Sequence, residues 1–284
     1  DGSSIVSGYR FNALNDERVL PLLSTRFEVA KADVFRSRAQ YDVFLANTFL
    51  TQRARALNIE SPLLPRDSGH LVFQASQSLT IDGSVTSVSV AQGRGSLIDI
   101  STNLDTYIGN GTSSAPGAIT LDAETLSSFD AESLLIGGKR TRTADGTSIQ
   151  VNSGNLTVDN AGSVLSANDL ILVAKNNLTI AAGAELTSTG SATSAAETVN
   201  LSGNGALVRL SANPSAQTIR TGVTTITSRV LSVGDGARLT AGTLVLDSSA
   251  NLSLSQTADL TARSYSLSSG RIRLLLDNPG SLLA

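Results

Sequence analysis

The chain has 284 residues, with 21 Lys and Arg against 24 Asp and Glu, one His and no Cys, Met or Trp. The missing cysteines exclude disulfides, thiolate zinc sites and iron–sulfur clusters, and the lone His70 excludes any site that needs two imidazoles. A net charge of −3 gives no general reason to expect nucleic acid as a partner, and no apolar run is long enough to predict membrane insertion. We therefore expect no metal and no cofactor, and the missing initiator Met and signal peptide predict a piece of a longer chain.

Small hydroxyl residues dominate the composition. The chain contains 40 Ser and 28 Thr, whereas aromatic residues make up only 4% of it. Hydrophobic residues still reach 40%, which is more than a disordered chain would carry. Hydroxyl residues mixed with aliphatic residues are typical of short strands joined by tight turns, so the composition predicts an all-β protein.

The first 66 residues differ from the rest and predict a helical segment that leads into the repeats. The run 27–57 contains no Gly and no Pro, and apolar residues recur in it at mostly helical spacing. Thr25–Glu28 fits a capping box at its start. We expect one long helix, or two helices with a break near Asn47, ended by the prolines that follow.

This helical lead is predicted to pack its apolar face on the neighbouring domain. Its polar face mixes both charges and lacks the cationic stripe that an anionic membrane favours, so a membrane-surface or partner-binding helix is the weaker interpretation. The lead is then an excursion from the main fold, with residues 1–10 belonging to an earlier coil of that fold.

From residue 67 onward the sequence is a short repeat. Each unit is an apolar–hydroxyl–apolar strand, a turn of small or polar residues, and a further aliphatic residue. A second apolar strand precedes most units by seven or eight residues. Five units align well: Leu79–Val85, Leu156–Leu165, Leu178–Leu186, Leu231–Leu239 and Leu252–Leu260.

The spacing of these units predicts a solenoid. The anchor positions are 22, 29, 24, 21 and 20 residues apart, at Leu156, Leu178, Leu207, Leu231, Leu252 and Ile272. A period near 21 with occasional insertions, and turns too short for a returning helix, favour a right-handed parallel β-helix over residues 67–284. Leucine-rich repeats share the period, but their L-x-x-L-x-L-x-x-N pattern is missing.

Strand alternation then predicts which side chains face the interior. Leu178 and Ile180 should point inward and Thr179 outward. Polar residues at the turns should form side-chain ladders between coils. Turn chemistry also explains the matches to the N-glycosylation acceptor pattern, most of which lie at strand starts: Asn110, Asn155, Asn177, Asn200 and Asn251.

Residues 67–284 resemble the filamentous-haemagglutinin family of large exoproteins exported by bacterial two-partner secretion. The resemblance rests on the repeated L-[TS]-[IVL] units and on Ser133–Thr147, SLLIGGKRTRTADGT, which is similar to a stretch typical of one subfamily. The short motifs of the family's N-terminal secretion domain are not present. The resemblance therefore implies an internal or C-terminal-half fragment of such a protein.

The family resemblance also implies a location and partners. It implies a non-catalytic rod, secreted or held on a Gram-negative cell surface, that serves adhesion, biofilm formation or host contact. Its partners would be an outer-membrane transporter of the two-partner type and a glycan or protein receptor in the host or biofilm. A further alternative is the stalk of a contact-dependent toxin, whose toxic domain would follow residue 284.

A polysaccharide-cleaving enzyme is the main alternative, because parallel β-helices also carry such active sites. These sites need clustered carboxylates beside a basic residue. The candidates are Asp99, Asp105, Asp122, Asp130 and Glu132, with Arg140 and Arg142 near them in sequence. Their spacing shows no register that would place two carboxylates side by side, so we expect them to be solvated surface residues with no catalytic role.

Three further features are candidate binding sites. Lys139, Arg140 and Arg142 form the densest basic cluster of the repeat region, which we interpret as an exposed basic loop or, alternatively, as contacts for an acidic glycan or phosphate. Asp67 and His70 are interpreted as loop-capping residues, because no second His or nucleophile accompanies them. Gly137–Asp145 lacks the third Gly of calcium-binding repeats and occurs once, so it predicts no calcium site.

Overall fold

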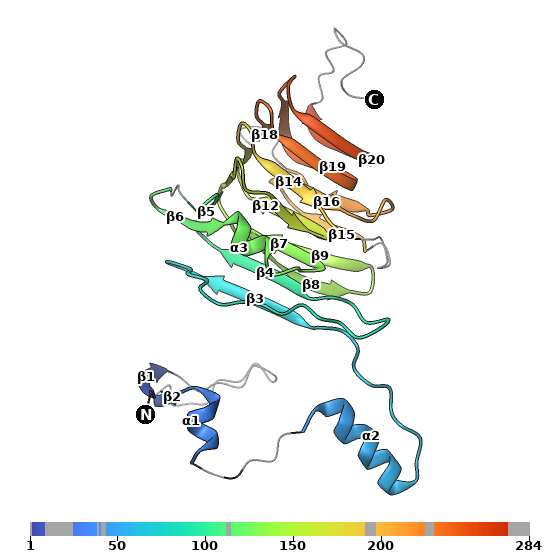
Figure 1. Cartoon of the computed structure of the whole chain (residues 1–284). Coiled ribbons are helices and arrows are strands. Elements are labelled where there is room, and N and C mark those ends of the chain that lie inside the picture. Colours follow the sequence, from blue (N-terminus) through green and yellow to red (C-terminus); the bar gives the residue numbers. More distant parts are fainter. Residues whose placement is uncertain are drawn as a thin grey trace. The chain divides into compact units, whose positions relative to one another are not determined.

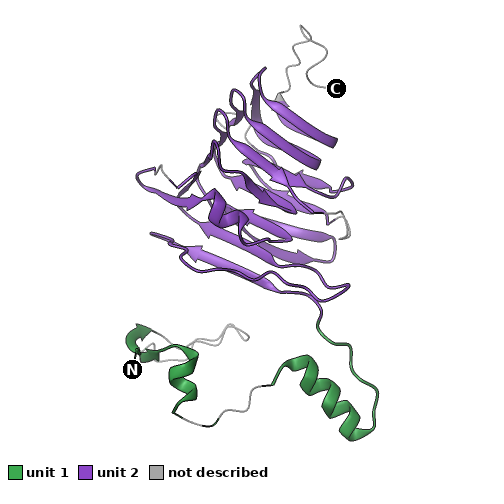
Figure 2. Ribbon diagram, viewed as in Figure 1, with its two compact units in different colours: residues 1–65 green, residues 66–284 purple. Residues whose placement is uncertain are grey.

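The chain forms two compact units, Asp1–Pro65 and Arg66–Ala284, which Figure 2 distinguishes by colour. The computed structural model describes residues 2–8, 25–38, 40, 44–111, 115–190, 197–224 and 230–271. The division lies within one residue of the position at which the sequence pattern changes.

The first unit contains a strand pair followed by two helices (Figure 1). Strand β1 (Ser4–Gly8) pairs antiparallel with β2 (Thr25–Val29), and the helices are α1 (Ala32–Arg36) and α2 (Ala46–Leu57). Among its described apolar side chains only Ala54 is buried.

The predicted helix over 27–57 is wrong at its beginning. Thr25–Glu28 is not a capping box but part of β2, where Phe27 lies opposite Val6. The alternation of Thr, Phe and Val in this segment suits a half-buried strand, and that preference prevails over the helical spacing. The helical part is divided, in agreement with one of the two alternatives, but the interruption precedes Asn47, which lies inside α2.

The second unit is built from strands, so the all-β prediction is confirmed. Its single described helix is α3 (Ala123–Ser127). The strands are β3 (His70–Ala75), β4 (Leu97–Thr102), β5 (Asp105–Gly109), β6 (Ala118–Asp122), β7 (Ser133–Ile136), β8 (Gly138–Thr143), β9 (Gly146–Val151), β10 (Leu156–Asp159), β11 (Leu165–Ala167), β12 (Asp169–Ala174), β13 (Leu178–Ile180), β14 (Glu185–Ser188), β15 (Val199–Ser202), β16 (Ala206–Ser211), β17 (Thr218–Thr221), β18 (Val230–Val233), β19 (Arg238–Leu254) and β20 (Asp259–Arg271).

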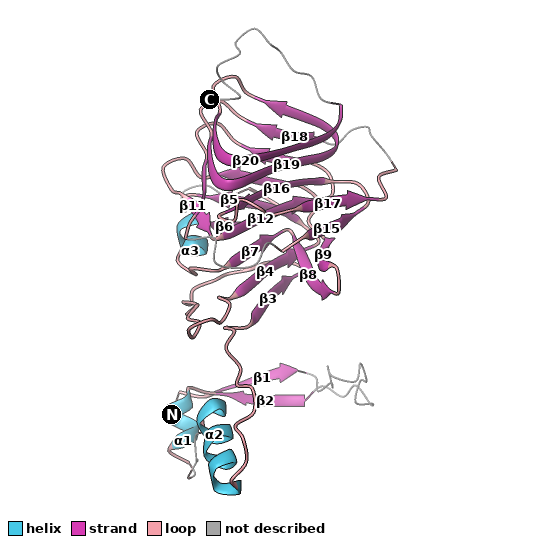
Figure 3. Cartoon of the chain, turned by 90° about the vertical axis from the view of Figure 1, so that its right-hand side faces the viewer, coloured by secondary structure: helices cyan, strands magenta, loops and turns pink. Residues whose placement is uncertain are grey.

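Most of these strands belong to one curled sheet. Its order is β3-β4-β7-β12-β16-β19-β18-β13-β10-β5-β6, with β11, β14 and β20 attached beside that path. The long strand β19 shows how the sheet curls, since its successive thirds pair with β14, β16 and β18. Figures 1 and 3 show the strands of the unit stacked in layers along its length.

The interior of the curled sheet is filled by aliphatic side chains in rows. One row runs across β4, β7, β12, β16 and β19 through Ile98, Leu134, Leu170, Leu210 and Leu244, all fully buried. The predicted inward positions are confirmed, because Leu178 and Ile180 are fully buried and Thr179 between them is partly exposed. Burial of this kind contributes about 1.5–3 kcal/mol for each large aliphatic side chain.

The register of the parallel strands corrects the predicted anchors. Leu178 pairs with Leu156 on one side and with Leu231 on the other, and Leu231 pairs with Leu252. Leu207 is therefore not an anchor: it lies on β16, which runs antiparallel between β12 and β19. The predicted intervals from Leu178 to Leu207 and from Leu207 to Leu231 are therefore one long interval between paired parallel strands. Within it the chain forms β15, β16 and β17 before it returns to the parallel stack at β18.

The ends of the predicted repeat also differ from expectation. Leu79–Val85 does not form a strand, although Leu79, Ile81 and Val85 pack against the interior with partly buried side chains. Ile272, the last predicted anchor, lies outside the described residues.

A second sheet covers part of the outer face of the first. Its order is β17-β15-β9-β8, and β8 and β9 form an antiparallel hairpin. A separate apolar cluster fills the space between the sheets, with Leu135, Ile171, Leu207 and Val245 from the curled sheet and Ile149, Val199 and Leu201 from the second. Strand β12 is consequently buried on both faces, which explains its continuous apolar run.

Candidate functional site

Charged side chains lie beside the apolar cluster between the two sheets. Asp99, Asp169 and Asp247 project from the outer face of the curled sheet on β4, β12 and β19, and each receives an arginine. These three pairs and the recesses beside them are the only described places where charged groups of the second unit are buried together. They form the candidate site, which we call the charged border.

The first pair joins Asp99 to Arg140 of β8. The Asp99 carboxylate is fully buried and accepts from the Arg140 backbone N at 2.8 Å and from Arg140 Nε at 2.5 Å. His70 Nε2 on the neighbouring strand β3 lies 2.9 Å from Asp99 Oδ2. Arg140 Nη1 donates to Ser133 Oγ at 2.8 Å, so its guanidinium is held on both sides.

The path of the chain explains how Arg140 arrives there. Gly137, between β7 and β8, has a φ of +95°, and a Cβ at this position would lie 2.0 Å from the carbonyl oxygen of Val173. Only glycine fits so close to a neighbouring backbone in that conformation. The chain can therefore turn directly from the curled sheet into the second sheet, which carries Arg140 over Asp99.

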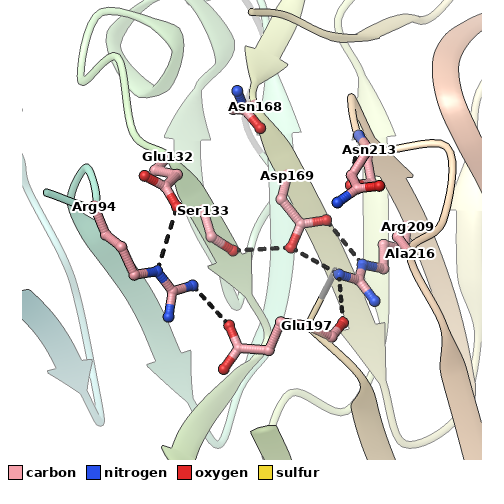
Figure 4. A pocket seen from close by; sticks show the side chains of 10 residues that line it. Arg94, Glu132, Ser133, Asn168, Asp169, Glu197, Arg209, Asn213 and Ala216 are labelled. Atoms are coloured by element: carbon pink, nitrogen blue, oxygen red, sulfur yellow. Dashed lines mark hydrogen bonds and ion pairs between the residues drawn. The ribbon is translucent and has the colours of Figure 1, made fainter. Parts of the chain in front are cut away.

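The second pair is bidentate and appears in Figure 4. Arg209 donates to Asp169 from Nε at 2.8 Å and from Nη2 at 3.2 Å, and its Nη1 donates to the Gln217 carbonyl at 2.8 Å. The Arg209 side chain is only 2% exposed. A bidentate pair fixes direction as well as distance, so Arg209 ties β12 and the segment before β17 to its own strand.

The third pair closes the far side of the interface. Arg220 of β17 donates from Nε to Asp247 and from Nη1 to the Gly203 carbonyl, the latter at 3.0 Å. Both side chains are nearly fully buried. Each outer strand of the second sheet, β8 and β17, is thus bound to the curled sheet by an Arg–Asp pair.

A partly buried network continues from the second pair (Figure 4). Arg94 Nη2 lies 2.9 Å from Glu197, and its Nε lies 3.5 Å from Glu132. Burial alone would raise the pKa of Glu197, but the Thr147 hydrogen bond and the Arg94 charge lower it below its usual range. Burial alone would lower the pKa of Arg94, but the hydrogen bond and charge of Glu197, with those of Glu132, raise it. Both groups are therefore charged over the ordinary pH range.

Two recesses adjoin these charges. The one drawn in Figure 4, beside Asp169 and Arg209, has a volume of about 20 Å³, which is room for a single water. The other has a volume of about 190 Å³ and lies over the beginning of β3 and β4, beside β8. It is lined by Asp67, Gly69, His70, Arg94, Gly95, Leu97, Arg140 and Arg142.

The structure does not gather the carboxylates that the sequence offers as catalytic candidates, and the expectation that they are solvated surface residues is wrong for Asp99, which is fully buried. Asp99 binds Arg140, Asp105 accepts from the Asn155 backbone N at 2.8 Å, and Asp122 caps α3 by accepting from Thr125 N at 2.8 Å. Asp130 is exposed, and Glu132 accepts from the backbone N of Gly95 and from Arg94. In the described ranges no three His, Cys, Asp or Glu side chains are placed to hold a metal ion.

The basic cluster is split by strand alternation. The prediction of an exposed basic loop is wrong for Arg140, which is 5% exposed and committed to Asp99. Lys139 is exposed on the opposite face of β8, and Arg142 lies at the recess with half of its side chain exposed. Contact of these residues with an acidic glycan stays a prediction. Asp67 does cap a loop, since it accepts from Arg94 N at 2.9 Å, but His70 binds Asp99.

The predicted ladders at the turns are confirmed. Asp105 accepts from both nitrogens of Asn155, and Asn155 Oδ1 accepts from the backbone and side-chain nitrogens of Asn177 at 3.2 Å. Asn177 Oδ1 in turn accepts from Val230 N at 3.2 Å. The Asn residues at these strand starts therefore have a structural role in joining successive layers.

Sequence reasoning misses most of the charged border. Asp169, Arg209, Arg220, Asp247 and Glu197 are not among the predicted site residues, because they lie far apart in the chain and belong to no motif. A signal is nevertheless present: Asp169, Arg209 and Asp247 each interrupt or adjoin an apolar strand run, and charged residues are rarely buried unless they are paired.

Comparison with protein-family models, with curated proteins and with solved structures gives no match. In the part of the chain that the structure describes, neither length nor apolarity would let any helix cross a membrane.

Proposed function

We propose that residues 67–284 form a right-handed parallel β-helix that serves as a structural and adhesive, non-catalytic segment of a large secreted or surface-exposed exoprotein. The proposal follows the resemblance to filamentous haemagglutinins and assigns export to an outer-membrane two-partner transporter. Its ligand would be a host or biofilm glycan or protein.

One observation carries the proposal: strands 21 or 22 residues apart pair in parallel on more than one side of the same interior. Leu165 pairs with Leu186 and Leu239 with Leu260, just as Leu156 pairs with Leu178 and Leu231 with Leu252. A chain that advances by one strand spacing each time it completes such a turn builds a rod. Right-handed crossovers between parallel strands are strongly preferred, which favours the right-handed form.

The charges of the border favour a structural role over catalysis. Each buried carboxylate already binds a buried arginine, and Asp105, Asp122 and Glu132 each accept a hydrogen bond from a backbone nitrogen. Asp130 is exposed. A glycosidase instead needs two free carboxyl groups on either side of the scissile bond, about 5–9.5 Å apart.

The proposal is tested by retention and turnover measured together. The purified chain, coupled to beads, is incubated with polygalacturonate, alginate and chitin oligosaccharides and with host-cell surfaces, with and without calcium. We expect retention on at least one of these surfaces and no released product above a heat-denatured control. Turnover that disappears on Asp105→Asn or Asp122→Asn in a chain with an unchanged unfolding temperature would instead establish the enzyme, and a chain that neither binds nor cleaves any of them would refute adhesion.

A further inference from the structure

The recess of about 190 Å³ beside β8 differs from the rest of the charged border, because it still has free binding capacity. It lies between the starts of β3 and β4 and the inner face of β8. Its volume is below the roughly 300 Å³ at which sites for drug-sized ligands begin, so it suits one small ring or group.

The arginines of this recess are not equivalent. Arg140 is neutralised by Asp99, and Arg94 is neutralised by Glu197 and Glu132. Arg142 donates no hydrogen bond within the described residues, and its only ion pair is a long one, with Nε 3.9 Å from Glu197 Oε1. That Glu197 is already engaged by Arg94 and Thr147. One guanidinium fork at the recess is thus free to bind a carboxylate.

Groups that can bind hydroxyls lie in the same recess. Asp67 uses Oδ1 to accept from Arg94 N, which leaves Oδ2 to accept from a ligand. The Nε2 of His70 is held by Asp99, which leaves its Nδ1 as the ring nitrogen available to a ligand. Leu97 and two glycines supply apolar lining.

This mixture favours a singly charged, hydroxyl-rich ligand over a phosphate monoester, which carries nearly two negative charges at pH 7. A carboxylate can pair with Arg142, whereas Asp67 would repel a more highly charged anion. Hydroxyl groups are the natural donors to the free Asp67 oxygen. An apolar floor suits the C–H face of a sugar ring.

We propose that the recess binds one uronate residue of an acidic polysaccharide, with its carboxylate on Arg142 and its hydroxyls on Asp67 and His70. This inference rests on the proposed adhesive function, since it names a ligand class for it. It also assigns Arg142, and not its neighbours Lys139 and Arg140, as the residue of the basic cluster that selects the ligand.

The test is calorimetric titration of the full chain with trigalacturonate. Arg142→Gln should weaken binding about tenfold to hundredfold, the range expected for a lost charge-assisted pair. Lys139→Gln, on the opposite face of the same strand, is the matched control and should change binding less than about twofold, as expected for a charge outside the site. Arg142→Lys should recover part of the loss, and unchanged unfolding temperatures should show that all the variants are folded.

Three further ligands decide between sources of the anion. Neutral trigalactose should not bind measurably, and neither inorganic phosphate nor a phosphorylated trisaccharide should displace trigalacturonate at matched ionic strength. Equal weakening by Arg142→Gln and Lys139→Gln, or equal affinity for the phosphorylated sugar, would overturn the proposal in favour of unselective charge attraction. Absence of trigalacturonate binding overturns it as well, whereas the bead retention described above would show whether adhesion itself still holds.

Discussion

The interior of the curled sheet and the interface outside it are two differently built cores of one unit. The interior is aliphatic, and its rows repeat from strand to strand, as in the row through Leu134, Leu170 and Leu210. The outer interface is a smaller aliphatic cluster beside three buried Arg–Asp pairs, made by strands that are far apart in the chain. The two regions therefore use burial in different ways.

The difference concerns specificity. A row of leucines stabilises any neighbour in register, so repetition alone extends the interior. The second sheet does not pack against a repeated row of side chains. If it slid along an apolar surface, it would lose little of its buried apolar area. Buried ion pairs fix the position of the second sheet, because a shift would leave a charge buried without its partner. We interpret the three pairs as position-fixing contacts, at a cost in desolvation that the interior avoids.

The largest expected effect is from breaking one such pair. Asp99→Ala leaves the Arg140 guanidinium buried without its carboxylate, so the free energy of unfolding should fall by about 3–5 kcal/mol. Urea denaturation measures it. Lys139→Ala, on the exposed face of the same strand, should change stability by no more than about 0.5 kcal/mol.

A double variant sharpens the same comparison. Asp99→Leu combined with Arg140→Met removes both charges and should recover most of the lost stability, since well-packed apolar pairs often replace buried ion pairs without loss. If Asp99→Ala alone costs less than about 1 kcal/mol, well below the usual cost of an unpaired buried charge, the pair does not fix the second sheet.

The two cores should be equally sensitive to lost packing. Leu178→Ala in the interior and Leu207→Ala in the outer cluster each remove a fully buried side chain, so each should cost about 2–5 kcal/mol. Thr179→Ala, partly exposed between two inward residues, should stay within about 0.5 kcal/mol. A cost for Thr179→Ala similar to that of Leu178→Ala would contradict the inward and outward directions of these side chains.

The interior of the curled sheet is the part of the fold that the sequence predicts best. Leu178 and Ile180 repeat a pattern that parallel stacking requires, so their inward direction can be predicted from spacing and alternation alone. The anchor assigned to Leu207 is wrong because that residue lies in an equally apolar run. When both faces of a strand are buried, the pattern no longer says which residues face the interior or which way the strand runs.

The charged border can be predicted from the sequence only in part. Asp99, Arg140 and Arg142 are candidates from the sequence, but their partnership depends on a turn at Gly137 that places β8 over β4. Arg140 and Arg142 share a face of β8, yet one reaches a buried carboxylate and the other a recess, and no local pattern separates them. Asp169 and Arg209 lie 40 residues apart, and only the antiparallel insertion of β16 brings them together.

A smaller effect is expected from the ladder that joins layers at the turns. Asn177→Ala removes the acceptor for Val230 N and the side-chain donor to Asn155, both in exposed positions. The free energy of unfolding should fall by about 1 kcal/mol, the ordinary contribution of a hydrogen bond. Hydrogen exchange should show the loss at Val230. Unchanged protection there would mean that strand packing alone holds the layers.

The smallest expected effect is a pH dependence at Glu197, in the partly buried network outside the three Arg–Asp pairs. Its pKa in the folded chain lies below its value near 4.5 in the unfolded chain, because the Thr147 hydrogen bond and the Arg94 charge outweigh the effect of burial. The unfolded chain therefore binds the proton first as the pH falls. The stabilisation is complete above about pH 4.5 and is lost as the pH falls toward the folded-state pKa. The difference in stability between the unaltered chain and Glu197→Gln should be constant above about pH 5, stay below about 1 kcal/mol, and shrink below about pH 4.5.

Glu28 is the matched control: hydrogen bonds from Arg38 and Ser3 lower its pKa to about 2, but it lies in the first unit. Glu28→Gln should leave the unfolding of the second unit unchanged at every pH. A Glu197 difference that grows as the pH falls would reverse this sign and show that burial dominates.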